Sequence, residues 1–245
     1  MIAGYIIPGS VLYSRYYKKS FFGFIFIEIL PYIVCAVINE GSLVKTFAAI
    51  LALYSFYEMG YLWNDKISVT TESRPSIREG FEDYKLKAFF IIRITMSSVF
   101  IYALCKFNDV DFYEQGILTI FILTVFYLHN TIKNPDHRLP TFIILNTLKI
   151  TFVFWLSHLS MELMLGFVPF LFIKTINYLR AKKIFPIEQN HEQKLYFPIF
   201  LAFIVVTPII YIKALPACLV FGIIYNTKKI KEYYSRAHQK IFKKI

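Results

Sequence analysis

The chain has 245 residues, of which 57% are hydrophobic, and a mean hydropathy of +0.52. A soluble core of this size would not bury so much apolar surface, so we expect part of that surface to face lipid. The formal net charge of +11 does not indicate a nucleic-acid partner, because the 27 lysines and arginines are spread over many loops instead of forming one basic domain.

Apolar runs recur along the chain at close to the length that a helix needs to cross a hydrocarbon core, roughly 20 residues. They lack the alternation of transmembrane β-strands, so they predict helices. The segments between them are too short for a second domain, and we expect residues 1–245 to form a single membrane-embedded domain. We predict an all-α, polytopic transmembrane helical bundle of about eight spans, at 21–38, 43–63, 86–105, 115–129, 139–159, 162–178, 196–212 and 214–227.

The basic residues predict the orientation of these spans, because loops rich in lysine and arginine stay in the cytoplasm. The opposite side receives only Lys45, Lys106 and Lys213. We therefore expect a multi-pass protein of the cell membrane with both termini in the cytoplasm. The abundance of lysine, isoleucine and phenylalanine favours a bacterial inner membrane. The segments assigned to the cytoplasm are 15–19, 66–87, 133–138, 180–194 and the tail from 228 onward.

Three acidic residues, Glu58, Asp65 and Glu72, are spaced by seven where the second span reaches the cytoplasm. Tyr61 and Ser68 fall between them, so a helix through this segment would place all five residues on one face. Three carboxylates on one face repel one another unless a cation lies among them. Mg²⁺ suits such a place, because it binds one or two carboxylates and takes its other ligands from phosphate and water.

Two arginines, Arg74 and Arg78, follow these acids. Their planar side chains are suited to holding diphosphate oxygens in bidentate fashion. The acids and arginines together indicate a site for a metal ion and a diphosphate. The alternative is that both arginines neutralise Glu72, Glu79 and Glu82 in an exposed loop.

Ionisable residues also fall inside predicted spans, at Glu58, Arg93 and Lys149. Each costs roughly 2.5–3.5 kcal/mol to insert into a membrane, which makes it a functional candidate. Arg93 in the third span and Lys149 in the fifth are at depths where they could face Glu58. The alternative is a buried pair with a purely structural role.

A second polar segment lies between the sixth and seventh spans. Arg180, Lys182 and Lys183 are followed by Glu188 and Glu192, which are one helical turn apart. The two acids are candidates for a second half of the metal site. The basic residues are equally explained as a signal for cytoplasmic placement.

The segment YLWNDKISVTTESRP resembles the first Asp-rich motif of UbiA-type membrane prenyltransferases, N-D-x-x-D-x-x-x-D followed by Arg-Pro. Asn64 and Asp65 match the start of that motif. Ser68 stands in place of its middle aspartate, and Glu72 in place of the last one. The Arg-Pro pair at 74–75 comes several residues earlier than in the family.

Two further segments are similar to this family, in a form close to that of decaprenyl-phosphoribose synthase relatives. In FYLHNTIKNPDHRLP, Tyr127 and Lys133 correspond to a tyrosine and a lysine that precede the fifth span. After the sixth span, Arg180, Lys182, Lys183 and Glu188 correspond to a second motif that carries a basic pair and an acid.

The resemblance implies a helical bundle with a central cavity open to lipid, although family members usually have nine spans. It also implies Mg²⁺-dependent transfer of a prenyl group from a prenyl diphosphate to an acceptor, with the bilayer as the protein's environment. The implied roles are catalysis for Asp65, Glu72 and Lys133; metal binding for Asp65, Glu72 and Glu188; and diphosphate binding for Asn64, Arg74, Arg78, Tyr127, Arg180 and Lys183.

A rival hypothesis from another class uses the same residues without a chemical step. A lipid-phosphate binder, or an ion-coupled membrane transporter, would also need acids and cations inside the membrane. Glu58 and Arg93 would then be the central pair. A transporter should depend on this buried pair, whereas an enzyme should depend on the acids of the loop after the second span.

Overall fold

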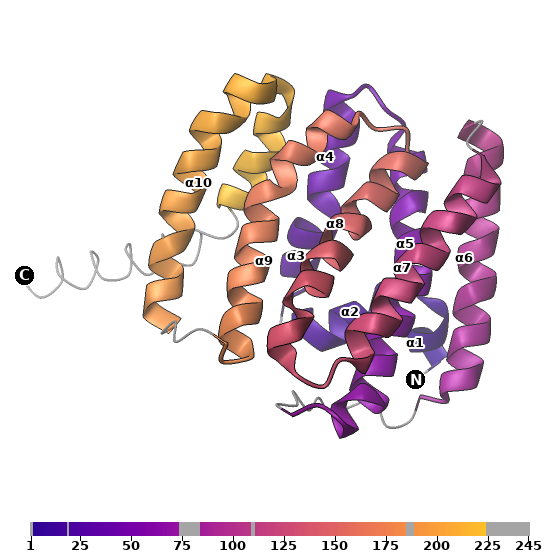
Figure 1. Ribbon diagram of the computed structural model, residues 1–245. Coiled ribbons are helices and arrows are strands. Elements are labelled where there is room, and N and C mark those ends of the chain that lie inside the picture. The colour runs from indigo at the N-terminus through magenta and orange to yellow at the C-terminus, as the bar shows by residue number, and fades with distance from the viewer. Residues whose placement is uncertain (1, 19, 74–83, 109–110, 185–188, 224–245) are drawn as a thin grey trace, which may run out of the picture.

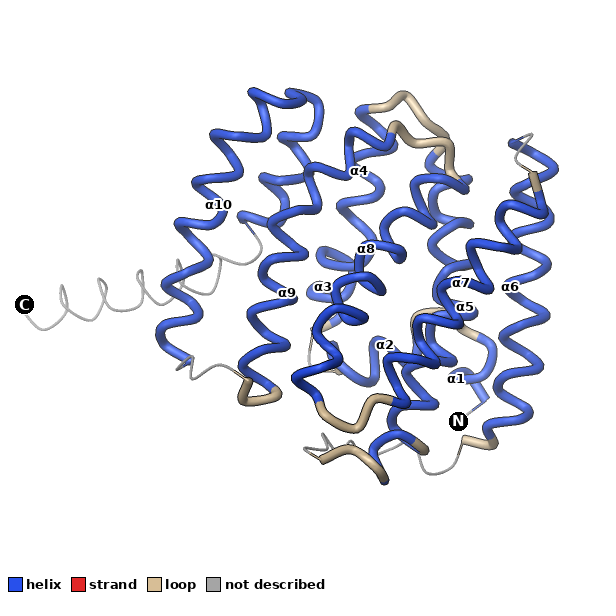
Figure 2. Tube along the Cα trace, in the orientation of Figure 1, coloured by secondary structure: helices blue, strands red, loops and turns tan. Residues whose placement is uncertain are grey.

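The computed structural model describes residues 2–18, 20–73, 84–108, 111–184 and 189–223. All regular secondary structure in these residues is helical, which confirms the predicted all-α class (Figure 2). Five helical segments are long and apolar enough to cross a membrane, as is typical of a multi-pass membrane protein. They are Phe21–Ile38, Leu86–Phe107, Phe112–Thr131, Pro135–Leu156 and Met161–Ala181.

The helices form one bundle, with the N-terminal segment folded into it (Figure 1). Their bounds are α1 (Ile2–Ile6), α2 (Ser10–Leu12), η1 (Tyr13–Tyr17), α3 (Phe21–Phe24), η2 (Ile25–Ile29), α4 (Leu30–Ile38), α5 (Leu43–Lys66), η3 (Ser68–Thr70), α6 (Leu86–Asn108), α7 (Phe112–Thr131), η4 (Pro135–Arg138), α8 (Leu139–Leu156), η5 (Met161–Phe167), α9 (Val168–Ala181), α10 (Gln189–Tyr211) and η6 (Ile212–Ala214). An apolar helix, Ile212–Ile223, ends the described chain.

Local sequence signals explain where several helices begin. Ser42 caps α5, because its hydroxyl accepts a hydrogen bond from the backbone N–H of Lys45 at 3.3 Å. Asp111 caps α7 in the same way, through the N–H of Tyr113 at 2.8 Å. Helices α4, α8 and α9 carry a proline in the first turn, where its missing N–H breaks no helical hydrogen bond.

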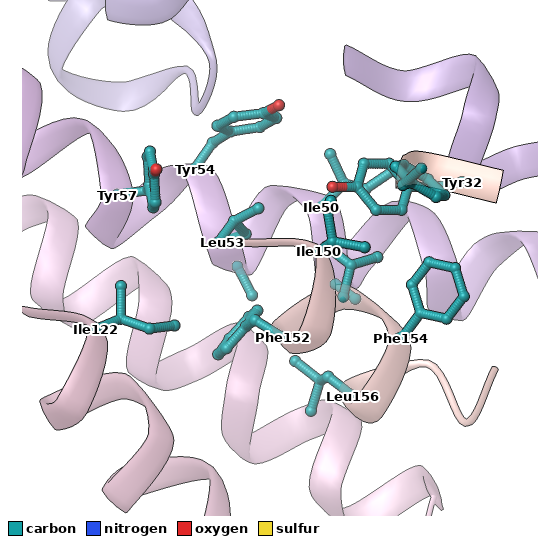
Figure 3. Packing of buried hydrophobic residues seen from close by; sticks show 14 of the residues in the cluster. Tyr32, Ile50, Leu53, Tyr54, Tyr57, Ile122, Ile150, Phe152, Phe154 and Leu156 are labelled. Atoms are coloured by element: carbon teal, nitrogen blue, oxygen red, sulfur yellow. The ribbon is translucent and has the colours of Figure 1, made fainter. Parts of the chain in front are cut away.

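Helix α5 is the centre of the bundle, and it contacts α4, α6, α7 and α8. Residues 52–60 along it are all buried, so no side of this stretch faces lipid. A helix surrounded by protein can carry polar groups that a lipid-facing helix cannot, which explains why α5 is absent from the five lipid-compatible segments. Ile50, Leu53 and Tyr54 of α5 pack beside Ile150 and Phe152 of α8 in the core (Figure 3).

The helix ends that border three of the predicted cytoplasmic loops lie at one end of the bundle, the lower end in Figure 1. The end of α5 and the start of α6 are found there, as are the end of α7 with the start of α8, and the end of α9 with the start of α10. For these three loops, the arrangement of the helices agrees with the alternation that the loop charges predict.

The predicted buried candidates Glu58 and Arg93 form an ion pair, with Arg93 Nη2 2.8 Å from Glu58 Oε2. Both side chains are completely buried, and both also bond the N-terminal segment. Arg93 Nη2 donates to the carbonyl oxygens of Gly4 and Ile7, at 3.0 and 2.8 Å. Glu58 Oε1 accepts from the N–H of Leu12 at 2.7 Å. The helix is interrupted between α1 and α2, and the pair supplies hydrogen-bond partners to backbone groups on both sides of this interruption.

Gly9 lies at this break, with a φ of 89°, a left-handed conformation that glycine adopts without strain. Because the backbone cannot continue as a helix here, its free carbonyls and N–H groups need side-chain partners inside the bundle. The Glu58–Arg93 pair therefore has a structural role, anchoring the N-terminal segment to α5 and α6.

We expect Arg93→Met to destabilise the protein strongly, because removing one member of a buried pair leaves an uncompensated charge and costs about 3–5 kcal/mol. The measurement is the thermal unfolding midpoint of the purified protein in detergent. Lys106→Met, at an exposed position of the same helix, is the control and should leave the midpoint nearly unchanged. Equal midpoints for the two variants would contradict the anchoring role.

Candidate anion-binding cavity

A cavity of about 330 Å³ opens among η1, α5, α7, α8 and α9, and we call it the basic cavity. Among the described residues, five cations and no aspartate or glutamate line it. Four asparagines and several aromatic rings complete the wall. The cations are Arg15, Arg138, Lys174, Arg180 and Lys182; the asparagines are Asn64, Asn130, Asn146 and Asn177; the tyrosines are Tyr16, Tyr57, Tyr61 and Tyr178.

Two acids stand behind the cations of the wall. Asp65 Oδ1 lies 3.2 Å from Arg15 Nη2. Glu72 Oε2 lies 3.3 Å from Arg138 Nη1, and its other oxygen accepts from Lys182. Charged side chains buried in this way need partners, so the acids hold the arginines and the lysine in fixed positions.

Arg15 is also held by aromatic rings. Its guanidinium lies 4.7 Å from the ring centre of Tyr61 and 5.2 Å from that of Tyr16. Burial by itself disfavours the charged form, but Tyr16, Asp65 and Tyr61 outweigh it and raise the pKa of Arg15 above its usual value. Arg15 is therefore a permanent positive charge at the cavity.

The predicted alignment of five residues on one helical face is wrong. Helix α5 ends at Lys66, and the short turn η3 follows, so Ser68 and Glu72 lie beyond the helix. Each of the three acids binds its own arginine: Glu58 binds Arg93, Asp65 binds Arg15, and Glu72 binds Arg138. The repulsion that suggested a shared metal ion is relieved by three separate ion pairs.

The described residues hold no preformed cluster of metal ligands. They contain no group of three or more histidine, cysteine, aspartate or glutamate side chains placed to hold a metal ion. Asp65 and Glu72, two of the expected ligands, are bonded to arginine and lysine instead. Glu188, the third expected ligand, lies outside the described residues. For Glu192, the structure describes the backbone and not the side chain. Magnesium binding therefore stays a prediction.

The residues expected to bind diphosphate divide into three groups. Asn64 and Arg180 line the basic cavity. Tyr127 and the catalytic candidate Lys133 are exposed and do not line it, and the same holds for Lys183. Arg74 and Arg78 lie outside the described residues.

Sequence reasoning missed several residues that shape this site. Arg15 and Arg138 counted only as signals of orientation, and Lys174 only as a lysine within a span. Lys182 was placed in the second motif but was not expected to bind Glu72. Glu28 was not considered, although it is a lone acid in the apolar run IFIEIL. An ionisable residue in such a run is expected to have a charged partner and a functional or structural role.

Glu28 also corrects the expected partner of Lys149. Lys149 does not face Glu58; its ammonium group bonds Glu28 instead. Helix α8 places Lys149 against η2, whereas Glu58 on α5 is turned toward α6 and the N-terminal segment. The packing of the helices therefore decides which acid Lys149 meets.

A second cavity of about 250 Å³ adjoins the basic cavity, and we call it the apolar cavity. The two cavities share Gly60, Phe126 and Asn130 in their walls. Phe126 packs directly on Gly60, where an added Cβ atom would lie 2.3 Å from the phenyl Cδ1. The other lining residues of the apolar cavity are Met59, Trp63, Phe90, Ile94, Leu123 and Tyr127.

Comparison with protein-family models, curated proteins and solved structures finds no match for this chain. The resemblance to UbiA-type prenyltransferases thus rests on the motif residues alone.

The contacts of Glu72 generate a test of its role. If Glu72 serves as the partner of Arg138 and Lys182, Glu72→Gln should lower the unfolding midpoint and retain or tighten binding of inorganic pyrophosphate, because the cavity becomes more positive. Calorimetric titration of purified protein without Mg²⁺ measures this. Two results together would contradict the ion-pair role: the wild-type protein binds pyrophosphate only with Mg²⁺, and the Glu72→Gln variant does not bind it. They would indicate that Glu72 is a metal ligand.

Proposed function

We propose that the protein binds the diphosphate group of a membrane isoprenoid in the basic cavity. The observation that carries this proposal is the composition of the cavity wall: five cations and no carboxylate among the described lining residues. Such a wall favours an anion with several oxygens, because arginine and lysine form charge-assisted hydrogen bonds with phosphate. The acids behind the wall keep these cations in place while the cavity is empty.

An unsatisfied hydrogen-bond donor of Arg138 supports this proposal. Arg138 is 2% exposed, and one of its Nη atoms has no hydrogen-bond partner among the residues that the structure describes. A buried donor of this kind costs free energy until an acceptor arrives. A phosphate oxygen supplies that acceptor together with a negative charge, in surroundings where water screens the interaction only weakly.

The apolar cavity supports a lipid rather than a free anion. It lies directly beside the basic cavity and is lined almost wholly by apolar and aromatic side chains. A ligand with a charged head and an apolar chain would have a suitable environment for each part in adjoining cavities.

The same proposal includes the finer topology. Besides the five lipid-compatible segments, we take α5, α10 and the Ile212–Ile223 helix as crossings, which gives eight spans in a UbiA-like bundle. The basic loops then put the basic cavity near the cytoplasmic face, with both termini in the cytoplasm. We assign the protein to a bacterial inner membrane on its composition.

Prenyl transfer is the second candidate function, and the placement of the motif residues favours it. Asn64 lines the basic cavity, and Asp65 and Glu72 bind its cations Arg15 and Arg138. In such a reaction the allylic C–O bond breaks, diphosphate leaves with the electron pair, and an acceptor forms the new bond to the prenyl carbon. The cations of the wall would stabilise the leaving diphosphate.

The ion-coupled transporter is less well supported. Its central pair, Glu58 and Arg93, bonds the backbone of Gly4, Ile7 and Leu12. These contacts give the pair a structural task that explains its burial.

The deciding experiment compares farnesyl diphosphate with farnesol, which has the same chain without the charge, by calorimetric titration of the purified protein. We expect binding of the diphosphate that weakens with added salt, and much weaker binding of farnesol. Equal affinities for both compounds would overturn the proposal.

A parallel assay of Mg²⁺-dependent diphosphate release separates the two functions. It uses a pool of acceptors and includes the Asp65→Asn and Glu72→Gln variants. Release that is lost in both variants establishes transfer, and binding without release establishes a binder.

The wall between the cavities gives a further prediction. Gly60→Ala should force Phe126 to move and cost about 1–3 kcal/mol, since the added methyl group has no space. Affinity for farnesyl diphosphate should fall more than affinity for pyrophosphate, because only the farnesyl chain would extend past Phe126 into the apolar cavity. Gly116→Ala is the control, as a Cβ atom there meets nothing within 4 Å. Equal losses of affinity for the two ligands would contradict the placement of the prenyl chain in the apolar cavity.

A further inference from the structure

A buried cluster of charges lies at the edge of the basic cavity, centred on Glu28. This glutamate is 1% exposed and belongs to η2. Its Oε1 accepts a hydrogen bond from the hydroxyl of Tyr17 at 2.8 Å, and its Oε2 from the hydroxyl of Tyr54 at 2.7 Å. Two lysines from different helices complete the cluster: Lys149 of α8 bonds Oε2, and Lys174 of α9 lies near Oε1.

The two lysines differ in how firmly they are held. The side chain of Lys149 is 3% exposed and bonds Glu28 directly. The side chain of Lys174 is 25% exposed, and its Nζ is 3.7 Å from Glu28 Oε1, beyond hydrogen-bond distance. Of the two, only Lys174 is among the residues that line the basic cavity.

Glu28 does not depend on Lys174 for its hydrogen bonds. Both of its oxygens already accept from Tyr17, Tyr54 and Lys149. Lys174 can therefore turn toward the cavity without leaving the buried carboxylate unsatisfied. Removing Lys149 would have the opposite effect, because Glu28 would lose its direct charged partner.

We propose that Lys174 is an anion-binding residue of the basic cavity, and that Glu28, fixed by Lys149 and the two tyrosines, positions it there. Without an anion, Glu28 balances the charge of Lys174 and limits its repulsion from Lys149. When a phosphate enters, the ammonium group of Lys174 bonds a phosphate oxygen, which is a closer and stronger contact than the 3.7 Å pair. This inference rests on the proposed function, since it names a further residue of the same site.

A comparison of the two lysines tests the inference. Lys174→Met and Lys149→Met each remove one positive charge beside the same glutamate, and they differ in access to the cavity. Inorganic pyrophosphate is titrated into the purified full-length proteins in detergent at low and at moderate salt, and thermal unfolding is measured alongside.

We expect Lys174→Met to weaken pyrophosphate binding about tenfold and to reduce its dependence on salt, with little change in the unfolding midpoint. Lys149→Met should lower the midpoint and keep the affinity of the folded protein close to that of the wild type. Lys174→Arg should restore most of the binding, because it returns a cation to the cavity.

Two results would overturn the inference, and they are distinguishable. If the wild type binds pyrophosphate and Lys174→Met binds it equally well, Lys174 is not a ligand, while the proposed function stands. If the wild type binds neither pyrophosphate nor farnesyl diphosphate, the proposed function falls and the inference falls with it.

Discussion

The requirement that every buried charge has a partner governs the interior of this bundle. Four acids, Glu28, Glu58, Asp65 and Glu72, are each bonded to at least one arginine or lysine from another part of the chain. In surroundings of low polarity an unpaired charge is costly, so each pair fixes the relative position of two segments. Glu58 ties the N-terminal segment to α5 and α6, and Glu72 ties the segment after η3 to η4 and the end of α9.

The same pairs prepare the basic cavity. Glu72 holds Arg138 and Lys182, and Glu28 holds Lys149 with Lys174 nearby, so each of these acids is close to two cations. Arg138, Lys182 and Lys174 line the cavity, whereas Lys149 and the two acids stand behind them. For the anion that we propose, this arrangement would present donors before binding and lower the reorganisation needed. The helices supply the rigidity that such a site requires.

The fold and the site were predictable to different degrees. Apolar runs predicted the helices, and the loop charges predicted an alternation that the helix ends follow at three of the loops. The motif residues Asn64 and Asp65 lie in the last turn of α5, and Asn64 lines the basic cavity. The alignment of Glu72 with Asp65 failed, because it assumed a helix that ends at Lys66. Arg15 and Arg138 were out of reach for local patterns, since they meet Asp65 and Glu72 only through packing of distant segments.

The sequence by itself determined that the chain is helical, suited to a membrane and strongly biased in the placement of its basic residues, because hydropathy and loop charge act locally along the chain. Only the tertiary structure decided which acid meets which cation. Lys149 and Arg93 were equivalent candidates for Glu58 by depth, yet helix packing gives Arg93 to Glu58 and Lys149 to Glu28. Partner choice depends on rotation and contact between helices, and no single segment encodes either.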